Sequence, residues 1–164
     1  MTLRRFERGD IPALALTLVE SFVMGEGKET AASLAVSSSS AFHCVLLYHF
    51  AHANIFHLIC NIIALIPFRP RWTTIAVGYL CATLSALILS IIIPGYGPVC
   101  GMSALIFALF ARRYAAWKLP VWRIILFNVP FLFIPQVDGL LHLLSFFSSY
   151  LIWKAVVTYS AKRR

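Results

Sequence analysis

Residues 72–93, WTTIAVGYLCATLSALILSIII, contain neither a charged residue nor a proline. A helix of this length spans the hydrocarbon core of a bilayer, which is about 30 Å thick. The rest of the chain has the same character: 60% of its 164 residues are hydrophobic and 12% are charged, whereas soluble domains carry about 25% charge. In lipid, backbone N–H and C=O groups need hydrogen-bond partners within the protein, and a long apolar run finds these partners by forming a helix. The sequence therefore predicts an all-α integral membrane protein.

Six apolar segments are predicted to cross the membrane and to form a single domain over residues 1–164. They are 11–24, 53–68, 72–93, 98–111, 119–135 and 139–158. The first also has the features of a secretory signal, but Glu20 interrupts it and no A-x-A site follows, so we interpret it as a helix. Pro130 lies inside the fifth segment and predicts a kink there.

The distribution of basic residues predicts the orientation in the membrane. The chain carries a net charge of +8 with 14 lysines and arginines, and with six crossings only Lys28 among them falls on the second side. Because cytoplasmic loops are enriched in basic residues, both termini are expected in the cytoplasm, with the protein in the cell (inner) membrane. Topology thus accounts for the charge, and nucleic-acid binding is not expected.

The connection 25–52 is the longest in the chain and is expected on the outer side. Its second half, AFHCVLLYHFAH (41–52), is apolar but contains three histidines, which suits the outer membrane interface. Cys60 and Cys81 fall inside predicted spans and are expected to be buried. Cys44 and Cys100 both fall on the outer side, where a disulfide between them is possible.

Polar residues inside membrane spans are costly, so they mark candidate functional positions. They are His52, His57, Asn61, Ser103, Asn128 and His142. The second, fourth and sixth segments run in the same direction, and Ser103 is expected about five residues into its helix. At about 1.5 Å per residue, the side chains on these three segments lie roughly 5–12 Å below the outer surface. Three helices are therefore expected to place polar groups at one depth.

This set of residues fits acyl transfer by a Ser–His dyad. A serine hydroxyl needs a base to remove its proton, and His142 is the embedded base at the depth of Ser103. His57, Asn61 and the free amides at the start of the fourth helix are donors that can hold an oxyanion. Taken singly, each of these side chains fits an interhelical hydrogen bond, as we expect for Asn128. Only their joint placement favours catalysis.

Other kinds of catalytic site fit the sequence less well. The chain has no H-E-x-x-H pattern and no carboxylate next to the histidines, so neither a metal site nor a cofactor is expected. An aspartyl intramembrane protease needs two embedded aspartates, and Asp138 is the only aspartate on the outer side.

The chain resembles the rhomboid family of intramembrane serine proteases. Residues 52–61, HANIFHLICN, match the family's H-x4-H-x3-N pattern. The run Gly101-Met102-Ser103-Ala104 matches three of the four places of its G-x-S-G motif, and His142 stands where the family keeps its catalytic base. The similarity covers nearly the whole chain and implies a minimal, six-transmembrane-helix rhomboid-like bundle.

The resemblance implies an endopeptidase that cleaves transmembrane or membrane-anchored protein substrates near the outer leaflet. Ser103 would be the nucleophile, and His142 would act as base and then as acid. His57, Asn61 and the Ser103 amide would donate hydrogen bonds to the oxyanion. The rhombosortases, small relatives that act on C-terminal anchors, are also similar in size, so the substrate class stays open. The alternative function is a catalytically silent relative that binds or escorts transmembrane helices.

The family motifs also imply supporting roles and show departures from the pattern. His52 would shape the first external loop, and Gly101 belongs to the serine motif. Phe107 falls where the family has a tyrosine stacked on the base. Ala104 and Ser145 replace glycines that bring the fourth and sixth helices into contact, and their side chains are expected to widen that contact.

Asp138 lies one helical turn before His142 and has three interpretations. It caps the sixth helix, it orients the His142 imidazole as the acid of a triad, or it is an exposed charge that raises the His142 pKa slightly. We expect the cap, because a capping carboxylate is already occupied by its own backbone.

Overall fold

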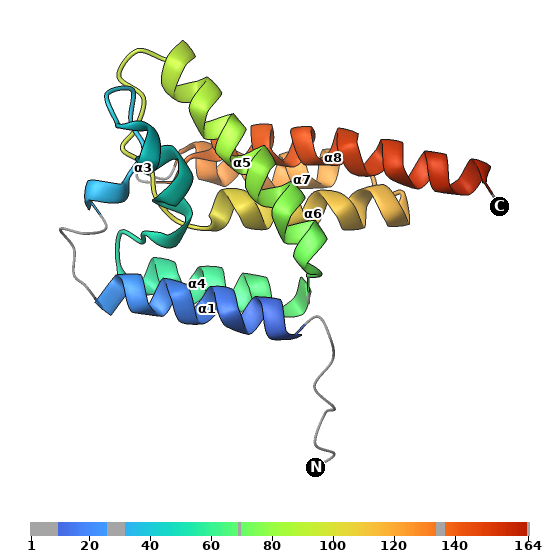
Figure 1. Ribbon diagram of the computed structural model, residues 1–164. Coiled ribbons are helices and arrows are strands. Elements are labelled where there is room, and N and C mark those ends of the chain that lie inside the picture. Colours follow the sequence, from blue (N-terminus) through green and yellow to red (C-terminus); the bar gives the residue numbers. More distant parts are fainter. Residues whose placement is uncertain (1–9, 26–31, 69, 134–136, 164) are drawn as a thin grey trace.

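The computed structural model describes residues 10–25, 32–68, 70–133 and 137–163. Its helices, with 3-10 turns marked η, are α1 (Asp10–Gly25), α3 (Phe42–Leu47), η1 (Tyr48–Phe50), α4 (Ile55–Leu65), η2 (Ile66–Phe68), α5 (Trp72–Ile92), α6 (Ser103–Trp117), α7 (Trp122–Asn128), η3 (Val129–Leu132) and α8 (Gly139–Lys162). Within these ranges the β-pairing is limited to one isolated bridge between Val36 and Val99. The predicted all-α class is confirmed, as Figure 1 shows.

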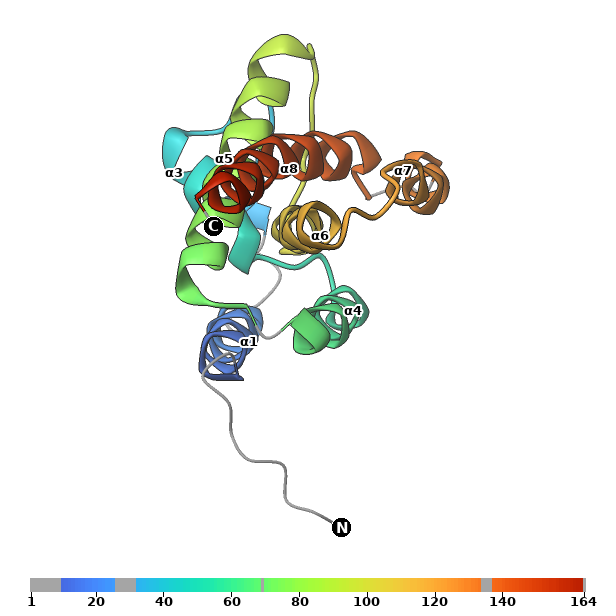
Figure 2. The ribbon, with the colours of Figure 1, turned by 90° about the vertical axis from the view of Figure 1, so that its right-hand side faces the viewer.

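Helix α6 lies at the centre of the bundle. Viewed along its axis in Figure 2, it is surrounded by α4, α5 and α8, with α7 beside α8 and α1 beside α4. Most of its residues from Ala104 to Ala111 are buried, on every side of the helix. A helix that is apolar all round belongs in such a position, because it has no face to present to a polar solvent.

Among the described residues, two helices have the length and composition to cross a membrane. They are α5 and α8, which correspond to the third and sixth predicted segments. The pair Phe42–Phe50 and Ile55–Leu65, bent by 74°, makes a third span if the pair is taken as one. The count of six crossings stays a prediction.

The fourth and fifth segments differ from their predicted bounds. Helix α6 begins at Ser103 rather than near residue 98, because the run PGYGPVCGM contains glycines with positive φ at 95, 97 and 101. At its other end α6 continues to Trp117, where Lys118 adopts a left-handed conformation. In the fifth segment the α-helix ends at Asn128 and a 3-10 turn follows, so Pro130 ends this helix instead of kinking it.

The segment 41–52 packs partly into the bundle, with His49 and His52 buried and His43 exposed, and its position at the outer membrane interface stays a prediction. The His49 side chain is 0% exposed, and its Nε2 lies 3.1 Å from the Thr83 hydroxyl of α5. The Tyr48 hydroxyl donates to the Ala82 carbonyl at 3.1 Å. His52 is also buried. Tyr48 and His49 tolerate burial because α5 supplies a hydrogen-bond partner for each.

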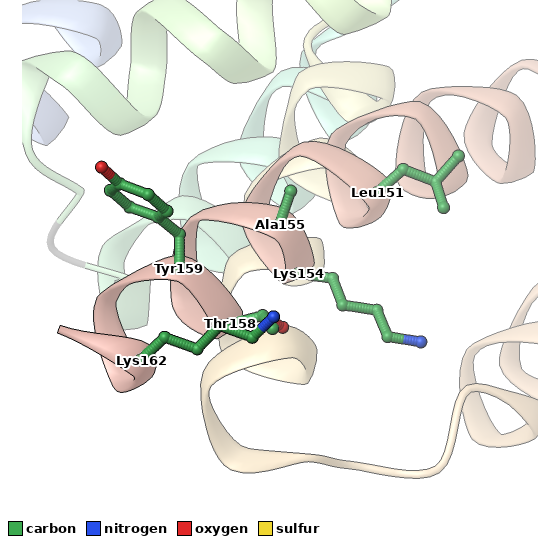
Figure 3. A pocket seen from close by; sticks show the side chains of 6 residues that line it. All are labelled: Leu151, Lys154, Ala155, Thr158, Tyr159 and Lys162. Atoms are coloured by element: carbon green, nitrogen blue, oxygen red, sulfur yellow. The ribbon is translucent and has the colours of Figure 1, made fainter.

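The C-terminal ends of α6 and α8 carry a group of basic side chains. Arg112 lies over Trp153, Arg113 over Phe68 and Trp117, and Lys154 over Tyr150. A shallow groove of about 410 Å³ follows the last turns of α8, and Figure 3 shows that its lining side chains all come from this helix. These cations lie at the end of the bundle away from Ser103, where α6 and α8 both finish.

Candidate active site

Ser103 and His142 are in hydrogen-bonding contact. Ser103 is the first residue of α6, and its Oγ lies 2.8 Å from Nε2 of His142 in the first turn of α8. The expected position of Ser103 five residues into its helix is therefore wrong, because α6 starts later than predicted. Further along the same two helices the Ser149 hydroxyl donates to the Ala108 carbonyl at 2.8 Å. Helices α6 and α8 thus run in the same direction with the dyad at their N-terminal ends.

Aromatic rings surround the His142 imidazole, whose residue is 3% exposed. The Phe107 ring stacks on it, with centroids 4.3 Å apart and planes within 8°, in the position that the sequence motif implies. The Phe131 ring meets it edge-on at 5.7 Å. His142 Nδ1 has no hydrogen-bond partner among the described residues. Packing, rather than a carboxylate, therefore holds the imidazole.

His57 and Asn61 of α4 approach the chain just before Ser103. Asn54 caps α4 by accepting the His57 amide proton at 2.9 Å, which starts the helix two residues before His57. A Cβ built on Gly101 would lie 2.5 Å from His57 Cε1 and 3.4 Å from Asn61 Nδ2. Only a glycine permits this approach. The Asn61 side chain is buried, and its Nδ2 has no partner within the described part of the chain.

The first turn of α6 adds backbone donors to this group. The Ile106 amide donates to the Met102 carbonyl at 3.0 Å, so the amides ahead of it, Ser103 included, have no acceptor within the helix. The positive end of the helix dipole lies at the same place. Side-chain and backbone donors therefore meet beside the Ser103 hydroxyl.

These groups line one cavity of about 550 Å³ between α4, α6 and α7. Phe56 of α4 and Phe127 of α7 contribute to its walls, and the polar groups gather where Ser103 and His142 meet. Cys60 also lines the cavity and is exposed, which corrects its expected burial, while Cys81 is buried as expected. The wall of the cavity is thus largely apolar, with a few polar side chains among the phenylalanines.

Asp138 is the N-cap of α8, as expected. Its Oδ1 accepts the Leu141 amide proton at 2.8 Å, and its Oδ2 accepts a hydrogen bond from the Tyr96 hydroxyl. The contact with Tyr96 has no signal in the sequence. Because the carboxylate faces these donors, the His142 Nδ1 has no hydrogen bond to it.

The other residues that the sequence analysis singled out lie near Ser103 and His142. Asn128 Nδ2 donates to the Gly139 carbonyl at 2.7 Å, which confirms its role between helices. His52 lies beside His57, with ring centroids 5.1 Å apart. Ala104 and Ser145 are both fully buried, yet the dyad distance of 2.8 Å is that of a hydrogen bond. Their added side chains have not separated the two residues.

The cysteines and metal-binding side chains add no further site. Cys44 and Cys100 are free thiols, so the possible disulfide does not form. In the described ranges, no three His, Cys, Asp or Glu side chains come together in a group that could hold a metal ion.

Comparison with known proteins gives one match. The family model described as Rhomboid domain matches residues 39–160, a range that contains His57, Asn61, Ser103 and His142. No curated protein and no solved structure matches the chain.

Proposed function

The chain belongs to the rhomboid family, and from this membership and the cavity geometry we propose that it is an intramembrane serine endopeptidase. Rhomboid proteins are integral membrane proteins, generally serine proteases that act on transmembrane substrates in the bilayer. The observation that carries the proposal is the 2.8 Å contact between Ser103 Oγ and His142 Nε2 inside a cavity. No cofactor takes part.

The reaction proceeds in two steps through an acyl-enzyme. Ser103 Oγ attacks the peptide carbonyl carbon while His142 Nε2, in the neutral tautomer protonated at Nδ1, accepts the hydroxyl proton. The carbon–nitrogen bond then breaks, and His142 returns that proton to the leaving amine. A water molecule next attacks the ester, gives one proton to His142, and releases the new carboxyl end as Ser103 regains its proton.

The negative charge on the carbonyl oxygen is held by three donors. They are the Asn61 side-chain amide, the His57 ring and the backbone amide of Ser103. Support comes from the buried Asn61 Nδ2 that has no other partner in the described residues and from the close approach of both side chains to Gly101. Donors fixed before the reaction contribute about 2.7–4 kcal/mol each to such an intermediate.

The substrate is a transmembrane or membrane-anchored segment that enters the apolar cavity between α4 and α7. Phenylalanine rings form much of its wall, so the side chains around the cleaved bond are expected to be apolar. The protein is further proposed to be one domain with six crossings and both termini in the cytoplasm of a cell with an inner membrane. The cations at the C-terminal ends of α6 and α8 support this orientation, which places the dyad near the outer leaflet.

Labelling with a fluorophosphonate probe tests the proposal. The purified protein should form a covalent adduct that is lost in Ser103→Ala and in His142→Ala. Ser85→Ala is the matched control, because it removes another buried serine hydroxyl, which donates to the Cys81 carbonyl. Cleavage of a transmembrane substrate in liposomes should likewise be lost in Ser103→Ala and in His142→Ala and be kept in Ser85→Ala. A folded protein that takes up no probe and cleaves nothing would instead support the silent, helix-binding alternative.

A further inference from the structure

A hydrogen bond outside the dyad joins the two chain segments that carry it. The Tyr96 hydroxyl donates to Oδ2 of Asp138. Tyr96 belongs to the connection 93–102 between α5 and α6, and its side chain is 8% exposed. The second carboxylate oxygen accepts the Leu141 amide proton. One carboxylate therefore links the connection that leads to Ser103 with the first turn of α8.

Both partners lie close to the dyad along the chain. Ser103 follows Tyr96 at the end of the same connection, and the His142 amide donates to the Asp138 carbonyl at 3.1 Å, one helical turn away. A shift of the connection relative to α8 would therefore change the distance from Ser103 Oγ to His142 Nε2 directly.

The backbone of the connection is held on its other side by residues 36–38. Val36 and Val99 exchange two backbone hydrogen bonds of 2.8 Å, and the Ser38 amide donates to the Tyr96 carbonyl at 2.9 Å. The Tyr96 side chain reaches from this anchored backbone to α8. Through the Tyr96 hydroxyl, the connection 93–102, held by residues 36–38, is thus joined to α8, the helix that carries His142.

Tyr96 is not placed to take part in the chemistry itself, and Asp138, although it lines the cavity that holds the dyad, directs its carboxylate oxygens at other donors. Tyr96 does not line the cavity that holds the dyad; it lines a separate cavity of about 390 Å³ beyond Asp138. Burial, together with the hydrogen bond to the Asp138 carboxylate, raises the pKa of Tyr96 well above its usual value, so the phenol stays a donor. Both carboxylate oxygens of Asp138 are already engaged.

We propose that Tyr96 is a positioning residue that, through Asp138, sets the separation of Ser103 and His142. This inference rests on the proposed function. The link lies where α6 and α8 begin, close to the buried Ala104 and Ser145. Its hydrogen bond holds the ends of the two segments together beside the dyad.

The test compares Tyr96→Phe, which removes only the hydroxyl, with Tyr79→Phe. The control also removes a hydroxyl that donates a hydrogen bond, in this case to the Leu46 carbonyl. A misplacement of 1 Å can lower a rate about 100-fold, so we expect kcat to fall about tenfold in Tyr96→Phe with KM unchanged. Tyr79→Phe should keep the kcat of the original protein. The ring resonances of His142, followed by NMR on histidine-labelled protein, should shift only in Tyr96→Phe.

Asp138→Ser completes a double-mutant cycle. Serine caps a helix as well as aspartate does but is too short to reach Tyr96. We expect its kcat to equal that of Tyr96→Phe, and the double variant to be no slower than either single one. Additive losses, a change confined to KM, or unchanged kcat and His142 resonances in Tyr96→Phe would each overturn the positioning role. If the original protein is inactive while the resonances still shift in Tyr96→Phe alone, the proposed function fails and the positioning link stands.

Discussion

Replacing Gly101 with alanine tests how closely the oxyanion donors depend on one missing side chain. The new Cβ would lie 2.5 Å from His57 Cε1 and 2.8 Å from Nε2, whereas carbon atoms in contact are about 3.5–4.0 Å apart. The His57 ring, or the backbone around residue 101, must therefore move by about 1 Å. A displacement of that size in a catalytic group costs about 100-fold in rate. We expect Gly101→Ala to lower the rate of probe labelling by about that factor.

Gly101→Ala also strains the backbone, and the same substitution at Gly95 measures this backbone strain separately from the collision with His57. Gly101 has φ +110°, where an L-residue is strained by about 1–2 kcal/mol. Gly95 has φ +73°, and a Cβ there would meet no atom within 4 Å. Gly95→Ala thus carries backbone strain without touching His57. Both variants should lose thermal stability, measured by unfolding in detergent, and Gly101→Ala should lose more because it adds the collision with His57. Only Gly101→Ala should lose labelling.

A third variant decides whether the steric contact is the cause. Gly101→Ala combined with His57→Ala removes the atoms that collide, so its labelling rate should be no lower than that of His57→Ala alone. The reasoning is refuted if Gly101→Ala labels as fast as Gly95→Ala, or if the two losses multiply in the double variant.

Four further measurements follow from the same structure. Topology reporters that work only outside the cytoplasm should be inactive when fused to either terminus, and activity at one end would contradict the orientation. Ala104→Gly should leave the labelling rate within about twofold, because the dyad is already at 2.8 Å; a clear increase would show that the dyad is stretched. Asp138→Asn keeps a capping acceptor and should lower turnover by less than about tenfold, whereas loss of a triad acid costs about 10⁴. A maleimide should alkylate Cys60 faster than the buried Cys81 and block probe labelling, and equal rates at both thiols would count against the cavity.

Much of the site follows from local patterns in the sequence. His57 and Asn61 lie four residues apart and so share one face of α4, and Ser103 and His142 each stand near the start of an apolar segment. Helix periodicity and a common direction of the segments are enough to bring these side chains to one level. The contact between Ser103 and His142 therefore agrees with the depth that the sequence predicts for both side chains.

Other features depend on contacts that local patterns do not contain. The hydrogen bond from Tyr96 to Asp138 joins residues 42 positions apart, and His49 finds its partner in Thr83, 34 positions away. The sequence shows only that Tyr96 lies among prolines and glycines and that His49 is a polar residue in an apolar run. Helix α6 also starts later than the hydrophobic pattern predicts, because apolar residues at 99–102 continue that pattern while the glycines around them prevent a helix.

The bridge between Val36 and Val99 sets a practical limit on how short an active fragment can be. A chain that begins at residue 39, where the family match begins, keeps the dyad, the oxyanion donors and the whole cavity wall. It loses Val36 and Ser38, whose backbone hydrogen bonds hold the connection 93–102. A design that transplants this site should therefore include residues 36–38 together with the motifs, because these residues hold the connection that leads to Ser103.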